Sequence, residues 1–306
     1  MRAGVQIKGV AKSFGNVKAV EDVSATINEG EIFGFIGPDG AGKTTLFRMI
    51  VTLLIPDAGK ITVNGADSMK DMKYIRSITG YMPGRFSLYH DLSVEENLRF
   101  YASIFGTTVD DNYETIKMIY GQLESYRKRP AGKLSGGMKQ KLALSCALVH
   151  KPEILVLDEP TTGVDAISRR EFWQILSVLK KKGITIIVST PYMDEANLCD
   201  RVALMQEGQI MEINSPSEIT GKFAKRIYSI RSGDLYKTLL FLRKADFTYS
   251  AFPFGQDIHF ISNDTGKDAE WIMQELNARG IDDARVEEIE PQVEDCFIDL
   301  MLKKNE

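Results

Sequence analysis

The stretch Gly37-Pro38-Asp39-Gly40-Ala41-Gly42-Lys43-Thr44-Thr45 limits what this chain can fold into more than any other part of it. It fits the pattern G-x-x-x-x-G-K-[ST], which is typical of a phosphate-binding loop. Residues 31–36 before it form an apolar run that predicts a buried strand, and residues 45–50 after it carry apolar side chains at helical spacing. This order of strand, glycine loop and helix favours a phosphate site over a plain glycine turn before a helix.

A loop of this kind holds phosphate groups mainly through its backbone. Glycines let the chain curve so that N–H groups point inward, and the positive end of the following helix adds a favourable dipole. The Lys43 ammonium is expected to reach the β- and γ-phosphates, and the Thr44 hydroxyl to bind Mg²⁺. The sequence therefore predicts a site for nucleotide phosphates and Mg²⁺.

The composition is that of a folded protein with a sizeable core. The chain has 306 residues, 43% hydrophobic and 26% charged, and a net charge of −4. This length suggests one large and one smaller domain, and the acidic balance gives no argument for nucleic-acid binding. No apolar run approaches the roughly 20 residues of a spanning helix, and the N-terminus lacks a signal-peptide core. Because Cys146, Cys199 and Cys296 lie far apart, a reduced, cytosolic compartment is the simplest interpretation.

A second chemical signal is the apolar run 154–159, which ends in Asp158 and Glu159. A buried parallel strand brings its C-terminal residues to the sheet edge where α/β proteins bind ligands. Asp158 is expected to hold Mg²⁺, directly or through water, and Glu159 to polarise a water for attack on the γ-phosphate. Two acids at a strand end are weak evidence alone and strong evidence after a phosphate loop.

A third signal is the segment Leu134-Ser135-Gly136-Gly137-Met138-Lys139-Gln140, which opens a helix. A helix that starts with Ser135, Gly136 and Gly137 offers a second anion-binding end. A capped helix with flexible glycines is the alternative. Phe14, near a turn before the phosphate loop, is either a packing residue or a stacking platform for adenine.

The rest of the chain reads as alternating strands and helices. Ser93 and Glu96 form a predicted capping box, and residues 93–130 look helical overall. Residues 185–189 predict another buried strand, followed by a short helix over 194–199. The other expected strands are 5–10, 23–27, 60–65, 78–83, 202–205 and 209–213, with helices near 167–182 and 216–223.

The C-terminal part has a different pattern of expected strands and helices. Strands are expected at 226–231, in a second region that ends with 259–262, and over 284–289. Helices are expected around 235–242, 269–276 and 294–302. This order predicts a small α+β sandwich without a catalytic constellation, in which His259 is structural. The predicted domains are 1–224, with a helical subdomain at about 85–150, and 225–306.

Together these segments resemble an ABC-type ATPase over residues 5–222. The phosphate loop, the Leu134–Gln140 signature and the strand ending in Glu159 carry the resemblance, with Asp165 at the position of the family's D-loop aspartate. Phe14 then matches the aromatic adenine platform. The resemblance implies ATP and Mg²⁺ as ligands and a P-loop NTPase fold of ABC type. In that fold a mixed α/β core joins an antiparallel β subdomain and a helical subdomain.

More narrowly, the chain resembles ATP-binding subunits of drug- and antibiotic-type exporters. Glu195-Ala196 and Cys199-Asp200-Arg201 fit that group, and the Asp39 variant of the loop is similar to the first nucleotide domain of tandem exporter ATPases. Two such domains dimerise head to tail, so the signature is expected to serve the partner chain's ATP. The resemblance implies membrane-spanning permease subunits as partners, contacted through residues 84–101. It also implies a cytoplasmic position on the inner face of the membrane.

Two positions depart from the family pattern. Gly84 stands where a glutamine is usual, and Pro191 stands where a histidine is usual. Neither side chain can place a water or contact the γ-phosphate. We therefore hypothesise a weakly hydrolytic site in a chain that completes a competent site on a related ATPase. The alternative is a working homodimer that tolerates both variants, since Glu159 persists.

Other function classes stay open at this point. A regulatory module would bind ATP to hold a closed dimer while a second chain hydrolyses. A soluble ABC ATPase of translation or chromosome maintenance is less favoured. Those proteins carry two nucleotide domains or a long coiled coil between loop and signature, and this chain has neither.

Overall fold

The computed structural model describes residues 3–84 and 88–304, so Arg85, Phe86 and Ser87 of the predicted contact segment 84–101 lie outside the described residues. The chain divides into two compact units, Met1–Pro216 and Ser217–Glu306. The break lies at the start of α7 (Pro216–Gly221), eight residues before the predicted boundary at 224. Within the second unit, the Cys296 thiol lies 3.7 Å from the Ile219 carbonyl oxygen, which ties α7 to that unit.

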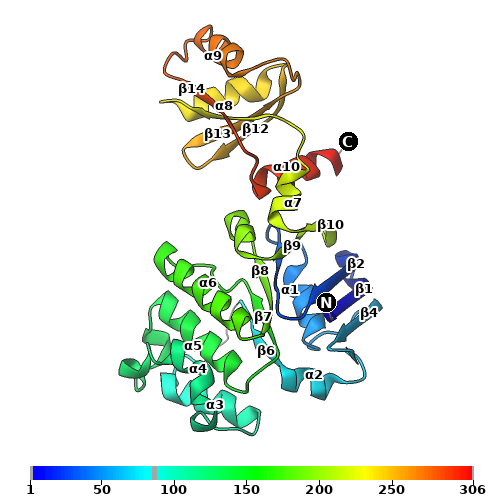
Figure 1. The fold of residues 1–306 in the computed structure, drawn as a ribbon, viewed down its shortest axis with the longest axis vertical. Coiled ribbons are helices and arrows are strands. Elements are labelled where there is room, and N and C mark those ends of the chain that lie inside the picture. The colour runs from blue at the N-terminus through cyan, green and yellow to red at the C-terminus, as the bar shows by residue number, and fades with distance from the viewer. Residues whose placement is uncertain (1–2, 85–87, 305–306) are drawn as a thin grey trace. The chain divides into compact units, whose positions relative to one another are not determined.

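The first unit is built on a six-stranded sheet in the order β10-β9-β3-β8-β7-β6 (Figure 1). β3, β8, β7, β6 and β9 run parallel, and β10 pairs antiparallel with β9. Every residue of the two strands that precede the loop and the acids, β3 and β7, is buried, as expected for parallel strands covered on both faces. The strands span β3 Ile32–Ile36, β6 Thr79–Met82, β7 Ile154–Asp158, β8 Thr185–Thr190, β9 Arg201–Gln206 and β10 Gln209–Asn214.

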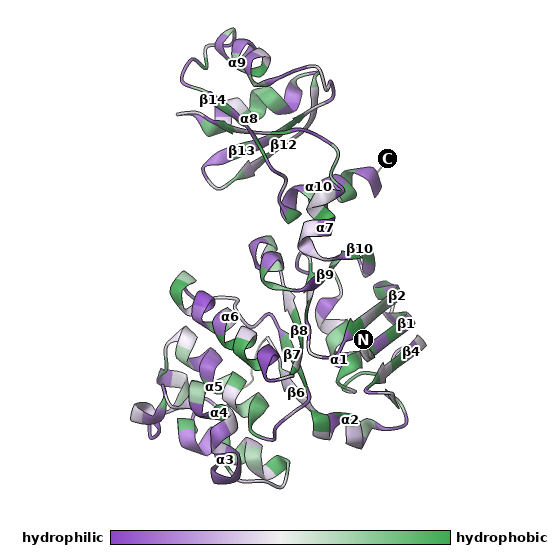
Figure 2. Ribbon diagram, in the orientation of Figure 1, coloured by the Kyte–Doolittle hydropathy of each residue, from purple (hydrophilic) through white to green (hydrophobic). Residues whose placement is uncertain are grey.

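A second, antiparallel sheet has the order β2-β1-β4-β5. The hairpin of β1 (Ala3–Phe14) and β2 (Val17–Asn28) alternates hydrophilic and hydrophobic residues, which Figure 2 shows as changing colour along the strands. β4 (Ala58–Val63) pairs with β1, and β5 (Ala66–Asp67) with β4. The apolar residues of this sheet share one core with the first sheet and with the helix that follows the glycine loop.

The helices of the first unit begin and end largely where the sequence predicts. The predicted capping box is present: the Glu96 N–H donates to the Ser93 hydroxyl at 3.2 Å, and the Ser93 N–H donates to the Glu96 carboxylate at 2.8 Å. Residues 93–130 are helical overall, as predicted, but they form several short helices, because Gly106 adopts φ 66° just after the first of them ends. The helices are α1 Lys43–Ile50, α2 Met72–Ile78, α3 Val94–Ile104, α4 Tyr113–Tyr120, α5 Gly136–Leu148 and α6 Ala166–Lys181, and the 3₁₀ turns are Asp110–Asn112, Glu124–Tyr126, Ala131–Lys133 and Met193–Leu198.

We expect His150 to make the first unit less stable in acid. Its ring stacks on Phe105 at 3.6 Å, and its Nε2 lies 3.3 Å from the Thr79 carbonyl oxygen. Burial lowers the pKa of His150 to about 4, below its ordinary value of 6.5. The unfolded chain therefore binds a proton between these two values that the folded chain does not, and the free energy of unfolding falls as the pH drops through this window. We expect a loss of about 1–2 kcal/mol, because solvent on the open side of the ring screens part of the charge.

The replacement His150→Phe keeps a stacked ring and removes the titrating group. Urea unfolding would be followed by Trp173 fluorescence in a Trp271→Phe background, since the chain has two tryptophans, one in each unit. The wild type should lose more stability than His150→Phe between about pH 7 and about pH 4.5. Replacement of the exposed His90 is the matched control. Equal pH dependence in wild type and His150→Phe would contradict the prediction.

The second unit is an α+β sandwich, as the sequence predicts. Its antiparallel sheet has the order β12-β13-β11-β14, and the chain order β-α-β-β-α-β is that of a split βαβ sandwich. Its elements are β11 Ile227–Arg231, α8 Leu235–Lys244, β12 Thr248–Phe254, β13 Asp257–Ser262, α9 Ala269–Asn277, β14 Arg285–Ile289 and α10 Val293–Lys304.

Two buried acids of α10 hold this helix within the second unit. The Asp295 carboxylate lies 2.7 Å from His259 Nδ1, and the His259 ring stacks on Phe254 at 4.1 Å. Asp299 accepts hydrogen bonds from Lys225 and Tyr249, with the tyrosine oxygen at 2.9 Å. These contacts agree with a structural role for His259.

Within residues 3–84 and 88–304, no helix combines the length and the apolar character that crossing a membrane requires.

Candidate functional site

The glycine loop joins the buried end of β3 to the first turn of α1. The Gly37 N–H donates to the Thr190 carbonyl at 3.3 Å, which holds the loop against the end of β8. Gly42 precedes α1 with φ 98°, and a Cβ there would lie 2.3 Å from the Ala19 carbonyl oxygen of β2. At Gly37 a Cβ would lie 2.1 Å from the Met205 carbonyl oxygen. Only glycine fits at these two loop positions.

Lys43 is buried in the loop that it ends. Its ammonium donates to the carbonyl oxygens of Gly37 at 2.7 Å and Pro38 at 2.9 Å, and it lies 3.6 Å from the Glu159 carboxylate. Burial lowers the pKa of Lys43, and the nearby carboxylates of Glu159 and Asp39 oppose that shift. The Lys43 ammonium thus places one positive charge within the loop, facing the Glu159 carboxylate just after β7.

Asp158, the last residue of β7, meets the loop through the Thr44 hydroxyl and is also bonded to Ser189 of β8. The Thr44 hydroxyl donates to Asp158 Oδ1 at 3.1 Å, and the Ser189 hydroxyl donates to the same oxygen at 2.7 Å. Asp158 is 3% exposed and Ser189 is fully buried. From the sequence, Ser189 is predicted only to lie in a strand. Its polar side chain at the end of an apolar run, beside the strand of the two acids, was the available signal.

Glu159 has an unusual backbone conformation. Its φ is 49°, in the left-handed region that is uncommon for residues other than glycine. Its N–H donates to both the hydroxyl and the carbonyl oxygen of Ser189, at 2.9 and 3.1 Å. Strained backbone that its surroundings over-determine is typical of functional sites.

A pocket of about 460 Å³ opens over the loop. Six of the predicted loop residues and Glu159 line it, while Gly37 and Pro38 contribute through their carbonyl oxygens to Lys43. Phe14 is not among the lining residues. It is 52% exposed and pairs across the hairpin with Val17, which does line the pocket. The full lining is Val17, Lys18, Ala19, Gly40, Ala41, Gly42, Lys43, Thr44, Thr45, Glu159 and Glu207, of which Val17, Lys18, Ala19 and Glu207 were not predicted.

The signature residues do not line this pocket. Ser135 caps α5, accepting from the Met138 N–H at 3.3 Å, and Ser135 and Gly136 are exposed. Gly137 packs against α6, where a Cβ would lie 2.5 Å from the Ser168 hydroxyl. Asp165 caps α6, accepting from the N–H groups of Ile167 and Ser168 at 3.1 and 3.0 Å.

The two positions that depart from the family pattern flank the acids of β7. Met82 pairs with Leu157 in the sheet, so Gly84 comes beside Glu159, and a Cβ at Gly84 would lie 2.9 Å from the Asp158 carbonyl oxygen. Pro191 follows Thr190, the last residue of β8 and the acceptor for the loop's first glycine. Both positions therefore lie next to residues of the site, although neither lines the loop pocket.

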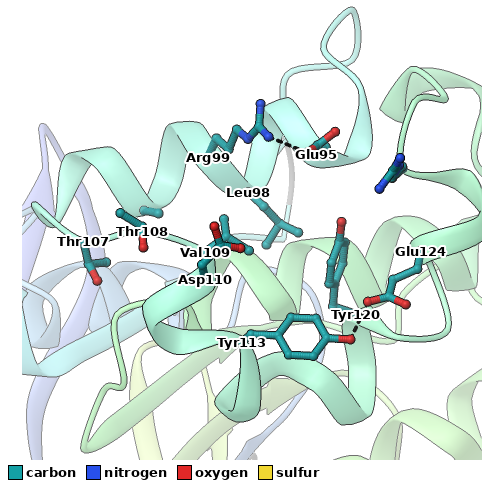
Figure 3. A pocket seen from close by; sticks show the side chains of 12 residues that line it. Glu95, Leu98, Arg99, Thr107, Thr108, Val109, Asp110, Tyr113, Tyr120 and Glu124 are labelled. Carbon is teal, nitrogen blue, oxygen red and sulfur yellow. Dashed lines mark hydrogen bonds and ion pairs between the residues drawn. The ribbon is translucent and has the colours of Figure 1, made fainter.

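A larger pocket of about 570 Å³ lies in the helical region (Figure 3). Its polar groups largely satisfy one another. Arg99 donates to Glu95 at 2.6 Å, and the Tyr113 hydroxyl donates to Glu124. None of the predicted site residues lines it, so the loop pocket is the candidate site.

A parallel sheet with a glycine loop before α1, and a neighbouring acid bonded to the threonine that follows the loop lysine, defines a P-loop nucleotide-binding protein. Similarity to known protein families and structures narrows this class. A family model described as ABC transporter matches residues 20–162. The chain belongs to the ABC transporter family, among its ATP-binding subunits.

Two curated relatives illustrate this membership. The probable multidrug ABC transporter ATP-binding protein YbhF of Escherichia coli (strain K12) is 39% identical over 310 residues, which cover 98% of this chain and 52% of that protein. The Nod factor export ATP-binding protein I of Sinorhizobium fredii is 33% identical over 304 residues, covering 97% and 85%. The chain thus spans about half the length of the first relative and most of the second.

Solved structures confirm the predicted fold class. An ATP-binding subunit of an ABC transporter matches with a TM-score of 0.65 at 26% identity, covering 72% of this chain and 92% of that one. A dimeric ATP-binding cassette in a post-hydrolysis state with ADP and Pi matches with a TM-score of 0.63 at 26% identity, covering 69% and 98%.

Proposed function

We propose that this chain is the ATP-binding subunit of an ABC exporter and couples ATP binding and hydrolysis to transport. The observation that carries the proposal is the meeting of Lys43, Thr44, Asp158 and Glu159 at the loop pocket. The ammonium suits the β- and γ-phosphates, and Glu159 suits the polarisation of a water. Closure around ATP would drive a membrane chain, and hydrolysis would reset it.

Mg²⁺ fits the residues that the loop brings together. The Thr44 hydroxyl and the Asp158 carboxylate are hard oxygen donors, which Mg²⁺ prefers alongside substrate phosphates. When bound, the ion would neutralise charge on the phosphate oxygens. The remaining predicted ligand contacts come from Phe14, from the loop Gly37–Thr45 and, for a second chain's nucleotide, from Ser135, Gly136 and Gly137.

The proposal includes an impaired site of this chain's own. Phosphoryl transfer depends on positioning and electrostatics, and losing one oriented contact commonly costs about 10²–10³ in rate. Gly84 and Pro191 offer no such contact beside Asp158 and Glu159. The chain would then bind MgATP, hydrolyse it slowly and lend its signature to a related, intact ATPase chain.

Partners and location follow from the proposed function. The dimeric cassette among the structural matches supports a two-chain arrangement in which Ser135–Gly137 face the other chain's nucleotide. The relatives named as ATP-binding proteins of a multidrug ABC transporter and of Nod factor export support a permease partner and a position on the inner face of the membrane. The contact role of residues 84–101 belongs to the same proposal.

The test is MgATP hydrolysis by the purified chain beside Glu159→Gln, with nucleotide binding measured for both. If the wild type and Glu159→Gln both bind ATP and neither hydrolyses it appreciably, the result supports the asymmetric site. The chain would then act as a regulatory module. Clear turnover by the wild type alone supports the working homodimer instead. Absence of ATP binding would contradict the proposed function.

We expect Phe14→Ala to weaken ATP binding about tenfold, because stacking of a base on an aromatic ring contributes about 1–3 kcal/mol. Phe14 is exposed at the hairpin beside the pocket rim, where a base can reach it. Calorimetric titration with ATP and with tripolyphosphate measures the effect. Only ATP should lose affinity, because tripolyphosphate has no base. An equal loss for both ligands would assign Phe14 to the hairpin's packing.

A further inference from the structure

Ser189 connects the two acids that end β7. Its hydroxyl accepts from the Glu159 N–H at 2.9 Å and donates to Asp158 Oδ1 at 2.7 Å. The side chain is fully buried, and Ser189 is the sheet partner of Asp158. A hydroxyl has one proton to donate, so this arrangement commits that proton to the Asp158 carboxylate.

The same carboxylate oxygen orients Thr44. Asp158 Oδ1 also accepts the Thr44 hydroxyl proton, at 3.1 Å. With that proton directed at Asp158, the lone pairs of the Thr44 oxygen are left for the loop pocket, which Thr44 lines. A continuous series of hydrogen bonds therefore runs from the Glu159 backbone through Ser189 and Asp158 to Thr44.

We propose that Ser189 is a positioning residue that sets the Mg²⁺ affinity of the site by holding Asp158 in the orientation that aims Thr44 at the ion. The inference rests on the proposed ATP site and adds a residue to it. Hydrogen-bond partners of metal ligands typically change metal affinity or activity by about 10–100-fold when they are replaced. Ser189 is fully buried and does not line the loop pocket, so its effect passes through Asp158 and Thr44.

The second bond of Ser189 serves the left-handed turn at Glu159. The Glu159 N–H is shared between the hydroxyl and the carbonyl oxygen of Ser189. Removing the hydroxyl leaves the carbonyl bond at 3.1 Å in place, so the turn keeps one partner. Loss of the hydroxyl should therefore act more on Asp158, and through it on Mg²⁺, than on the backbone.

The experiment measures the dissociation constant of ATP with Mg²⁺ and with EDTA in its place. The quantity compared is the Mg²⁺-dependent ratio, which is the constant in EDTA divided by the constant with Mg²⁺. We expect Ser189→Ala to reduce this Mg²⁺-dependent ratio about 10–100-fold and to leave the affinity in EDTA within about twofold. Ser189→Thr keeps the hydroxyl and should restore the ratio. Ser189→Cys fills the buried position with a weak donor and keeps the test available if the alanine variant does not fold.

Thr185→Val is the matched control. Thr185 is a buried hydroxyl of the same strand, and it accepts from the Gly30 N–H at 2.9 Å at the opposite end of β8. Its replacement should leave the Mg²⁺-dependent ratio unchanged. A second check uses the Asp158→Asn background. If Ser189 acts through Asp158, Ser189→Ala should lower the Mg²⁺-dependent ratio by less than about twofold in this background.

The outcomes separate this inference from the function on which it rests. A wild type that binds ATP, with the same Mg²⁺-dependent ratio in Ser189→Ala, would overturn the inference alone. Full, additive loss in the Asp158→Asn background would also overturn it. A wild type that does not bind ATP under either condition would overturn the proposed function and the inference together.

Discussion

Replacing Pro191 with histidine should raise the rate of MgATP hydrolysis about 10²-fold, because a single oriented contact to a transferring phosphate is worth about that much. Position 191 follows β8 directly after Thr190, whose carbonyl accepts from Gly37 of the phosphate loop. A histidine there could donate to the γ-phosphate and hold a water, whereas the proline ring has neither donor nor acceptor. Steady-state phosphate release by the purified chain, with and without Pro191→His, measures the gain.

The double variant Pro191→His with Glu159→Gln is the control for this prediction. If the gained activity uses the proposed base, this second change removes it while ATP binding persists. The gain should lie in kcat, with KM changed little, since the contact forms mainly in the transition state. Unchanged turnover in Pro191→His with intact ATP binding would mean that position 191 does not limit the reaction.

The two departures from the family pattern differ in how far they can be reversed. Pro191 is half-buried after the end of a strand, and histidine can adopt the φ that proline imposes. At Gly84, by contrast, a Cβ would lie 2.9 Å from the Asp158 carbonyl oxygen, so a glutamine needs the backbone to shift. Glycine at 84 is thus part of how the ends of β6 and β7 pack. The missing histidine is the simpler defect to repair.

The sequence predicts the fold best where one residue pattern has one physical outcome. The runs that became β3, β7 and β8 are continuous and apolar, and the structure buries all three. Gly37 and Gly42 identify the loop because no larger side chain fits at either position. The helix α2 was missed, since it has seven residues, two of them buried, and no side-chain cap.

The site was predictable residue by residue but not as a network. Local patterns identify Lys43, Thr44, Asp158 and Glu159, because each stands at the end of a recognisable element. The role of Ser189 depends on β8 lying between β3 and β7, which is a property of the sheet order. The same holds in the second unit, where the element order could be read but the pairing of His259 with Asp295, 36 residues apart, could not.

Replacing Lys43 with alanine should weaken ATP binding about 10²–10³-fold, because removing one member of a buried, hydrogen-bonded charge pair costs about 2–5 kcal/mol. Lys43 is 3% exposed and is the cation at the mouth of the loop, between the carbonyls of Gly37 and Pro38 and the Glu159 carboxylate. Its loss would leave the phosphates facing that carboxylate without a compensating charge. Calorimetric titration with MgATP measures the change in affinity.

Lys18→Ala is the matched control, because Lys18 lines the same pocket from its exposed rim. The Lys18 side chain is 66% exposed and its ammonium pairs with Glu21 at 2.5 Å, so solvent screens the charge and its removal should weaken ATP binding less than about threefold. A comparable loss in both variants would indicate that general positive charge, rather than the buried lysine, attracts the nucleotide. Strong loss confined to Lys43→Ala ties binding to the loop itself. It also accounts for the burial of a lysine near the end of β7, because the carboxylates of Glu159 and Asp39 offset the cost of desolvating its ammonium only in part, and a polyanionic ligand would offset more of it.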